Sequence, residues 1–209
     1  MERRLLEIIF FVLAETFIFS TWFLFLFFVR RTGVSEVLYE LNIYLSPVLL
    51  IFLSCYDLDL RKALMNTLRS KDVFILIAAF TVWGFIFAYY GENAIGMFYL
   101  PAIAQEINFR LVIFNFLRKY MSDFPAVILQ ALLFMVFYSN YVIFEPEGWP
   151  GIQLPIYLMD MLIMGIIYGA LYYIRKSIYI DIILHNSLFD LILVLPAFLG
   201  FIPYTMLPT

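Results

Sequence analysis

The sequence has few charged residues and very few of the side chains that usually hold catalytic metals. Of its 209 residues, 14% are charged and 65% are hydrophobic, whereas a soluble domain is typically about 25% charged and 45–50% apolar. The single cysteine, Cys55, cannot form an internal disulfide. One histidine and one cysteine do not provide the three protein ligands of a catalytic zinc site. We therefore expect a membrane protein with no metal and no cofactor.

The sequence also lacks an excess of positive charge. The net charge is -3, and no cluster of lysine and arginine is long enough to suggest nucleic-acid binding. The basic residues that are present divide unevenly along the chain. Ten fall where alternate loops would share one side: Arg3, Arg4, Arg61, Lys62, Arg69, Lys71, Arg118, Lys119, Arg175 and Lys176. Cytoplasmic loops are enriched in such residues, so we predict a cytoplasmic-type membrane with the N-terminus inside and the C-terminus outside.

Long apolar runs predict the fold, because about 20 such residues can cross a bilayer as a helix. We expect seven spans, at 5–29, 36–56, 73–90, 98–117, 124–144, 155–174 and 177–196. The first run lacks a signal-peptide cleavage site and is interpreted as a retained span. Residues 57–72 suit an interfacial helix, and Gly165 and Gly169 have the spacing of close helix packing. The expected fold class is all-α, a polytopic membrane helix bundle forming one domain over 1–209.

Polar side chains remain inside the predicted spans, where a charge costs at least ~2.5–3.5 kcal/mol at the bilayer centre and usually faces the bundle interior. They are Glu15, Gln105, Glu106, Arg110, Tyr138, Ser139, Asn140, Asp160, Asp181, His185, Asn186 and Asp190. Glu106 and Arg110 are four residues apart, so they share a helix face and can form a structural ion pair. Asp181 lies four residues before His185, a spacing that suits a carboxylate orienting an imidazole.

Three of these segments carry recognisable patterns. "AQEINFRLVIFNFLRKY" is similar to a helix with an EExxxR motif, and "ILQALLFMVFYSN" resembles an FxxxH helix, with Phe134 at the Phe position. "MGIIYGALYYIRKSIYIDIILHNSLFD" resembles a glycine-rich helix, a turn and a histidine-bearing helix. Together they resemble the CPBP (CAAX protease and bacteriocin-processing, or Abi) family of intramembrane proteases. The resemblance implies a CPBP-like core over residues 101–194, after N-terminal helices over 1–100.

The resemblance also implies roles for individual residues. In the family, the first Glu of the pair and the FxxxH histidine are thought to activate a water for peptide-bond hydrolysis, and the second Glu and the Arg to hold the site together. Gln105 stands in the place of the first Glu, and Tyr138 in the place of the histidine. Glu106 and Arg110 match the other two positions.

A later family histidine, with an Asn or Asp four residues on, is thought to stabilise the oxyanion. His185 fits that histidine, but Phe189 stands four residues beyond it and Asp190 one further. A register shifted by one would pair Asn186 with Asp190 and displace the histidine. The family-equivalent site is therefore expected at Gln105, Glu106, Arg110, Tyr138, His185 and Asp190.

These replacements favour a loss of protease chemistry. A glutamine amide cannot accept a proton from water at ordinary pH, and tyrosine, with a reference pKa near ~10, replaces histidine poorly at neutral pH. General acid–base assistance is typically worth ~10²–10⁴-fold in rate. We expect a non-catalytic binding or scaffold protein, surrounded by membrane lipids, that uses the former substrate cleft for a membrane protein or a prenylated or transmembrane peptide.

Two other functions stay open. One is an active intramembrane CAAX-type endopeptidase that uses Glu106 or Asp190 as its base. The other is a small proton-coupled transporter with a relay of Glu15, Asp160, Asp181 and Asp190. A transporter is expected to show broken helices or an internal repeat, and the sequence predicts neither.

Overall fold

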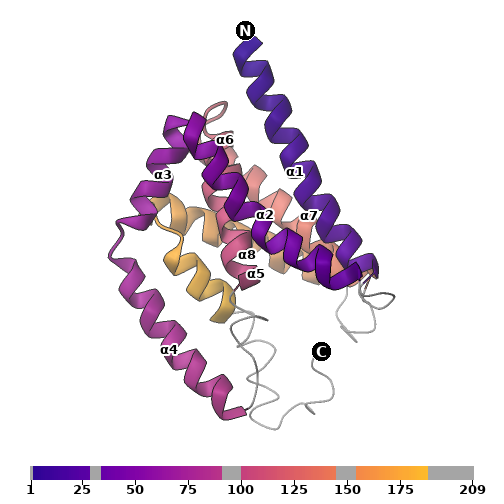
Figure 1. The fold of residues 1–209 in the computed structure, drawn as a ribbon, viewed down its shortest axis with the longest axis vertical. Helices are drawn as coiled ribbons and strands as arrows, with labels where there is room; N and C mark the ends of the chain where they lie inside the picture. Colours follow the sequence, from indigo (N-terminus) through magenta and orange to yellow (C-terminus); the bar gives the residue numbers. More distant parts are fainter. Residues whose placement is uncertain (1, 29–33, 91–99, 145–153, 188–209) are drawn as a thin grey trace.

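The computed structural model describes residues 2–28, 34–90, 100–144 and 154–187, and they form helices with no strand among them (Figure 1). In chain order the elements are α1 (Glu2–Phe28), α2 (Val34–Tyr56), α3 (Leu58–Leu68), α4 (Asp72–Tyr90), α5 (Leu100–Glu106), the π-helix η2 (Ile107–Phe114), α6 (Asn115–Leu117), α7 (Asp123–Phe144) and α8 (Leu154–Arg175). Residues 179–187 are also helical. The predicted all-α class is confirmed.

Among the described residues, two stretches are long and apolar enough to be candidate membrane spans. Arg4–Leu24 in α1 and Tyr157–Arg175 in α8 are long and apolar enough to cross a bilayer, judged by length and composition. Shorter apolar stretches occupy Pro47–Tyr56, Asp72–Phe85 and Asp123–Ser139. The first and sixth predicted spans thus meet this criterion over the described residues, and the count of seven stays a prediction.

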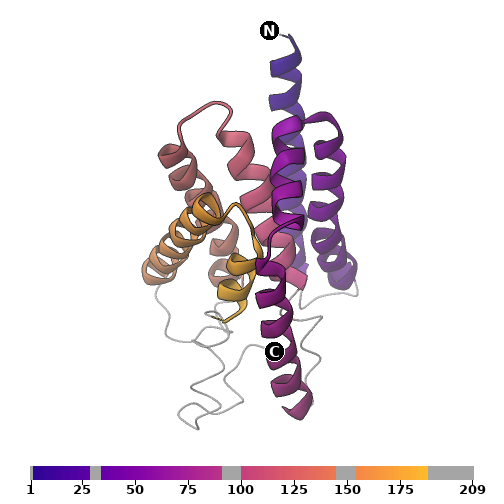
Figure 2. The ribbon, with the colours of Figure 1, turned by 90° about the vertical axis from the view of Figure 1, so that its left-hand side faces the viewer.

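The bundle is arranged around η2. In the two perpendicular views, η2 lies between a pair formed by α1 and α2 and a second pair formed by α7 and α8, with α4 at the edge (Figures 1 and 2). The core around η2 is rich in aromatic rings, and Phe109 contacts both Phe134 and Phe137 edge to face, with centroids 5.1 and 5.5 Å apart. Within a membrane such rings stabilise the bundle through van der Waals packing rather than through removal from water.

The α7–α8 contact depends on small residues, as the sequence predicts. A Cβ atom added to Gly165 would lie 2.9 Å from the backbone Cα of Ala131. One added to Gly169 would lie 3.3 Å from Val127. The absence of side chains lets the helices approach until the Gln130 amide donates a hydrogen bond to the Gly165 carbonyl, at 3.2 Å. The interpretation of the two glycines as packing residues is confirmed.

A tight turn joins apolar α2 to the short polar helix α3. Asp57 caps α3 by accepting two backbone N–H groups of its first turn, at 3.0 and 3.1 Å. Arg61 reaches back and donates to the carbonyls of Ser54 and Cys55 at the end of α2. The Asp57 carboxylate therefore supplies acceptors for N–H groups at the start of α3, and the Arg61 guanidinium supplies donors for carbonyls at the end of α2. α3 lies within the range 57–72 for which an interfacial helix is predicted, and its place at a membrane interface stays a prediction.

Candidate active site

The helix that carries three of the predicted site residues changes its hydrogen-bond register in mid-course. After Glu106 the α-helix gives way to eight residues of π-helix, which include Arg110. π-Helical turns are rare overall, but those that occur often lie at functional sites. Buried carbonyls that lose their α-helical hydrogen bonds in such a turn need other partners. The Asn115 side chain supplies one, because its Nδ2 donates to the carbonyls of Arg110 and Leu111 at 3.0 and 2.9 Å.

Glu106 and Arg110 form the predicted ion pair. The Arg110 Nε lies 2.9 Å from the Glu106 Oε2, and neither side chain is exposed. The three Arg110 nitrogens make no hydrogen bond with any described residue, so the contact with Glu106 is Coulombic. The guanidinium also lies over two rings, 5.1 Å from the centroid of Phe134 and 5.6 Å from that of Tyr168. The pair faces the bundle interior, and this prediction is confirmed.

His185 crosses the bundle to meet the same glutamate. Its Nδ1 lies 2.8 Å from the Glu106 Oε1, and the ring of Tyr168 stacks on the imidazole with centroids 5.6 Å apart. The expectation that Asp181 orients this imidazole is wrong, because the ring points across to α5 rather than along its own helix. Asp181 is fully buried, and its carboxylate oxygens make no hydrogen bond with any residue that the structure describes.

Tyr138 completes a continuous hydrogen-bonded chain. Its hydroxyl donates to the Gln105 Oε1 and lies 2.8 Å from the His185 Nε2. Residues of α5, η2, α7 and the helix at 179–187 thus meet in the order Gln105, Tyr138, His185, Glu106 and Arg110. Gln105 and His185 are each 6% exposed and Tyr138 is 3% exposed. Gln105, Tyr138 and His185, three of the family-equivalent positions, therefore contact one another directly.

Other predicted residues stand apart from this chain. Asp190 and Phe189 lie outside the described residues, as does the side chain of Asn140. Asn186 is buried, and its amide donates to a carbonyl of its own helix, that of Ile182, at 3.1 Å. Asp160 is exposed on α8. The suggested proton relay is therefore not continuous through Asp160 in the described part of the chain.

One buried contact was missed from the sequence. Glu15 of α1 accepts a hydrogen bond from the Asn108 amide of η2 at 3.0 Å, and both side chains are buried. Asn108 lies two residues after Glu106 inside an apolar run, which is the same signal that identified the other buried polar groups. The contact fixes α1 to the helix that carries the site.

The chemistry open to this arrangement is limited by how its atoms are already engaged. The Glu106 Oε1 contacts the His185 Nδ1, and the Oε2 lies beside the Arg110 Nε in an ion pair. A general base must lie within reach of a water, but Glu106 is fully buried, and the Gln105 amide is not basic. Among the described residues, no three His, Cys, Asp or Glu side chains lie close enough to hold a metal ion.

Comparison with known proteins adds one finding. Residues 92–192 match the family model described as Type II CAAX prenyl endopeptidase Rce1-like. That range contains all six family-equivalent positions: Gln105, Glu106, Arg110, Tyr138, His185 and Asp190. No curated protein and no solved structure gives a significant match.

Proposed function

We propose that the chain is a membrane-embedded member of the CAAX-protease family that binds a membrane ligand without cleaving it, since residues 92–192 match the Rce1-like family model. The observation that carries this proposal is the Tyr138 hydroxyl, which bridges Gln105 and His185. In the family, the residues at 105 and 138 jointly activate a water. Here they hydrogen bond to each other, and neither is a base at neutral pH.

Glu106, the family-equivalent carboxylate that the structure describes, does not compensate. Glu106 neutralises Arg110 and holds the His185 imidazole, and it is fully buried. Withdrawing it to accept a proton from water would leave the guanidinium of Arg110 without its counter-charge at membrane depth, where an unpaired charge is costly. Glu106 therefore acts as a structural residue.

The ligand that suits the surroundings is a hydrophobic segment, namely a membrane protein or a prenylated or transmembrane peptide. An apolar groove of about 680 Å³ runs between α1, η2 and α7. Its lining includes Phe19 and Phe23 of α1, Ile113 of η2 and Leu133 of α7. Ile113 of η2 is three residues from Arg110, and the mostly apolar lining of the groove favours a lipid chain or an apolar helix.

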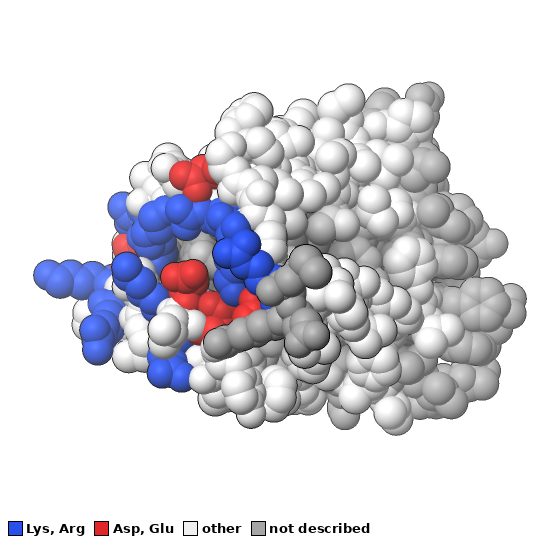
Figure 3. All heavy atoms as spheres, turned by 90° about the horizontal axis from the view of Figure 1, so that it is seen from above, with Lys and Arg blue, Asp and Glu red and all other residues white. Residues whose placement is uncertain are grey.

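We further propose seven spans with a cytoplasmic N-terminus. On the face at which α1 begins, lysine and arginine side chains gather around a hollow (Figure 3). This clustering supports the positive-inside assignment made from the loops.

The proposal is tested by binding and turnover in one preparation. The full chain in nanodiscs is titrated with a fluorescent prenylated CAAX peptide, and anisotropy and product are followed together. We expect saturable binding and no product. Glu106→Gln is the matched comparison, because it removes the charge and keeps the shape. Product formed by the unmodified chain and lost in Glu106→Gln, or no binding at all, would overturn the proposal.

A second function has one observation in its favour. The contact of 2.8 Å between Glu106 and His185 is a carboxylate–imidazole pair of the kind that activates nucleophiles. It supports an active endopeptidase with Glu106 as its re-sited carboxylate. Turnover that depends on both residues, in variants that keep the melting temperature of the unmodified chain, is the result that this function requires.

A further inference from the structure

A polar pocket opens on the face where basic side chains gather (Figure 3). Its volume is about 440 Å³, and its walls come from α3, from the segment between α6 and α7, and from the end of α8. Four cationic side chains line it: Lys62, Arg118, Lys119 and Lys176. Asp59 is the carboxylate among its lining residues. The lining therefore carries an excess of positive charge.

Two of the four cations are already neutralised and two are not. Arg118 pairs with Asp123, and Lys119 pairs with Asp57. Lys62 forms no ion pair with any described residue, and the Nζ of Lys176 lies 3.9 Å above the ring of Tyr173. Partial burial and the nearby Arg118 guanidinium lower the pKa of the Lys176 amine, and the Asp123 carboxylate acts in the opposite direction. A bound anion would add a further negative charge beside Lys176 and Arg118.

The backbone of Lys176 is itself unusual. Its φ is 57°, which makes it the one non-glycine residue with positive φ in the described part of the chain. Its N–H donates to the Tyr172 carbonyl at 2.8 Å and ends α8 in the left-handed conformation that glycine normally supplies. Glycine would fill this position with less strain but would place no amine in the pocket. Strained residues of this kind gather at sites that clamp ligands.

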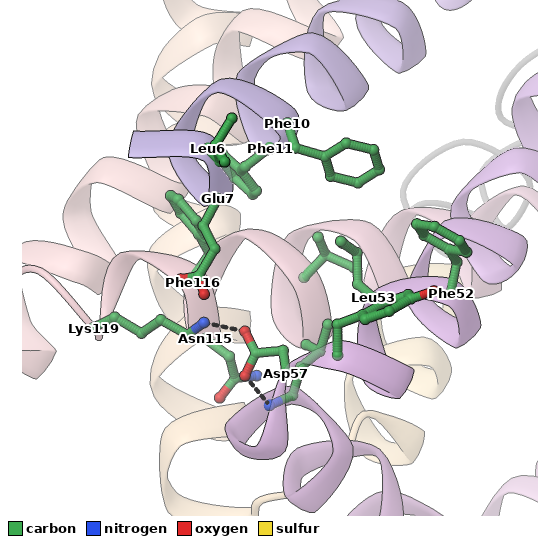
Figure 4. Close-up of a pocket in the computed structure, with 13 residues that line it drawn as sticks. Leu6, Glu7, Phe10, Phe11, Phe52, Leu53, Asp57, Asn115, Phe116 and Lys119 are labelled. Atoms are coloured by element: carbon green, nitrogen blue, oxygen red, sulfur yellow. Dashed lines mark hydrogen bonds and ion pairs between the residues drawn. The ribbon is translucent and has the colours of Figure 1, made fainter. Parts of the chain in front are cut away.

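An apolar pocket lies next to the polar one. It has a volume of about 390 Å³, lies between α1, α2 and η2, and shares Asn115 and Lys119 with its polar neighbour (Figure 4). Its other walls are mostly aliphatic and aromatic and include Phe10, Phe11 and Phe52. Its acidic members are Glu7 and Asp57, and Asp57 is bonded to Lys119. A cationic pocket and an apolar pocket thus meet at two shared residues.

We propose that the paired pockets bind one anionic phospholipid, with its phosphate against Lys62 and Lys176 and one acyl chain in the apolar pocket. A free phosphate would use only the cations, and an uncharged lipid only the apolar walls. Joined cationic and apolar surfaces match a ligand that has both parts. The site is separate from the polar chain around Glu106, so this inference does not depend on the proposed function.

The test compares lipids and matched variants. The full chain in detergent is titrated with phosphatidylglycerol, phosphatidylcholine or glycerol 3-phosphate, and bound lipid is counted by native mass spectrometry. Lys62→Gln/Lys176→Gln removes two charges from the pocket. Arg69→Gln/Lys71→Gln removes the same charge from positions that are exposed, as Lys62 and Lys176 are, but that line neither pocket. Lys176→Gly removes the amine and also relieves the strain of the positive φ at this position. It therefore keeps the test available if the double variant does not fold.

We expect phosphatidylglycerol to bind with a stoichiometry of one. Loss of two lysines beside an anionic headgroup should weaken it at least ~10-fold, and the exposed pair should have no effect. Three results would overturn the proposal: equal binding of the two lipids, equal loss in the two double variants, or binding of glycerol 3-phosphate as tight as that of the lipid.

Discussion

Tyr138 and His185 lie in direct contact, with the phenol oxygen 2.8 Å from the imidazole Nε2, although 47 residues separate them in sequence. The same hydroxyl donates to Gln105. The contact joins α7 to the helix at 179–187 and places a tyrosine where the family resemblance expects a histidine. Removal of the Tyr138 hydroxyl should therefore change the environment of the His185 imidazole.

The first prediction uses the single histidine of the chain. With nitrogen-15 histidine, His185 gives the imidazole resonances without overlap. Tyr138→Phe should shift the Nε2 resonance, and Glu106→Gln should shift the Nδ1 resonance, because each change removes one hydrogen-bond partner. Tyr173→Phe, at an exposed position, is the control. Unchanged imidazole resonances in the two site variants would mean that the hydrogen-bonded chain is not formed.

The second prediction concerns the buried ion pair. Arg110→Ala leaves Glu106 without its cation in the bundle interior, and breaking a buried pair typically costs ~3–5 kcal/mol. The melting temperature in detergent should fall far more than for Arg69→Ala, which removes an exposed arginine. Equal melting temperatures of the two variants would show that the pair contributes little.

The third prediction tests the α7–α8 contact with two glycines. Gly165→Ala would place a methyl group 2.9 Å from the Ala131 backbone, so the helices must separate, at a cost of roughly 1–3 kcal/mol. Gly84→Ala in α4 meets no atom within 4 Å and should be neutral or stabilising, since alanine is the better helix former. Loss of stability at position 84 and not at position 165 would contradict the packing described here.

The fourth prediction concerns orientation and uses the single cysteine. Cys55 is exposed near the end of α2, on the side that the loop charges assign to the cytoplasm. A membrane-impermeant maleimide should therefore modify it in inverted vesicles and not in intact cells. Glu147→Cys in a Cys55→Ser background should show the opposite pattern. Labelling of Cys55 from outside would reverse the orientation.

The sequence predicted the features that local geometry determines. The Glu106–Arg110 pair follows from a spacing of four on one helix, and the close packing of α8 follows from two glycines spaced alike. The predicted partner of His185, Asp181, is wrong, because only the packing of separate helices brings Glu106 to the imidazole. No amino-acid composition is characteristic of a π-helix. Neither the change of hydrogen-bond register after Glu106 nor the role of Asn115 could therefore be inferred from the sequence.

We propose that the site does not hydrolyse peptide bonds. The most direct measurement is the rate of product formation from a prenylated CAAX peptide by the unmodified chain in liposomes, followed by mass spectrometry beside Gln105→Glu/Tyr138→His. We predict no product from the unmodified chain. The double variant should regain at most partial activity, since it restores the acid–base pair but not the spacing of the residue after His185. Robust cleavage by the unmodified chain, abolished by Glu106→Gln without loss of melting temperature, would contradict the claim.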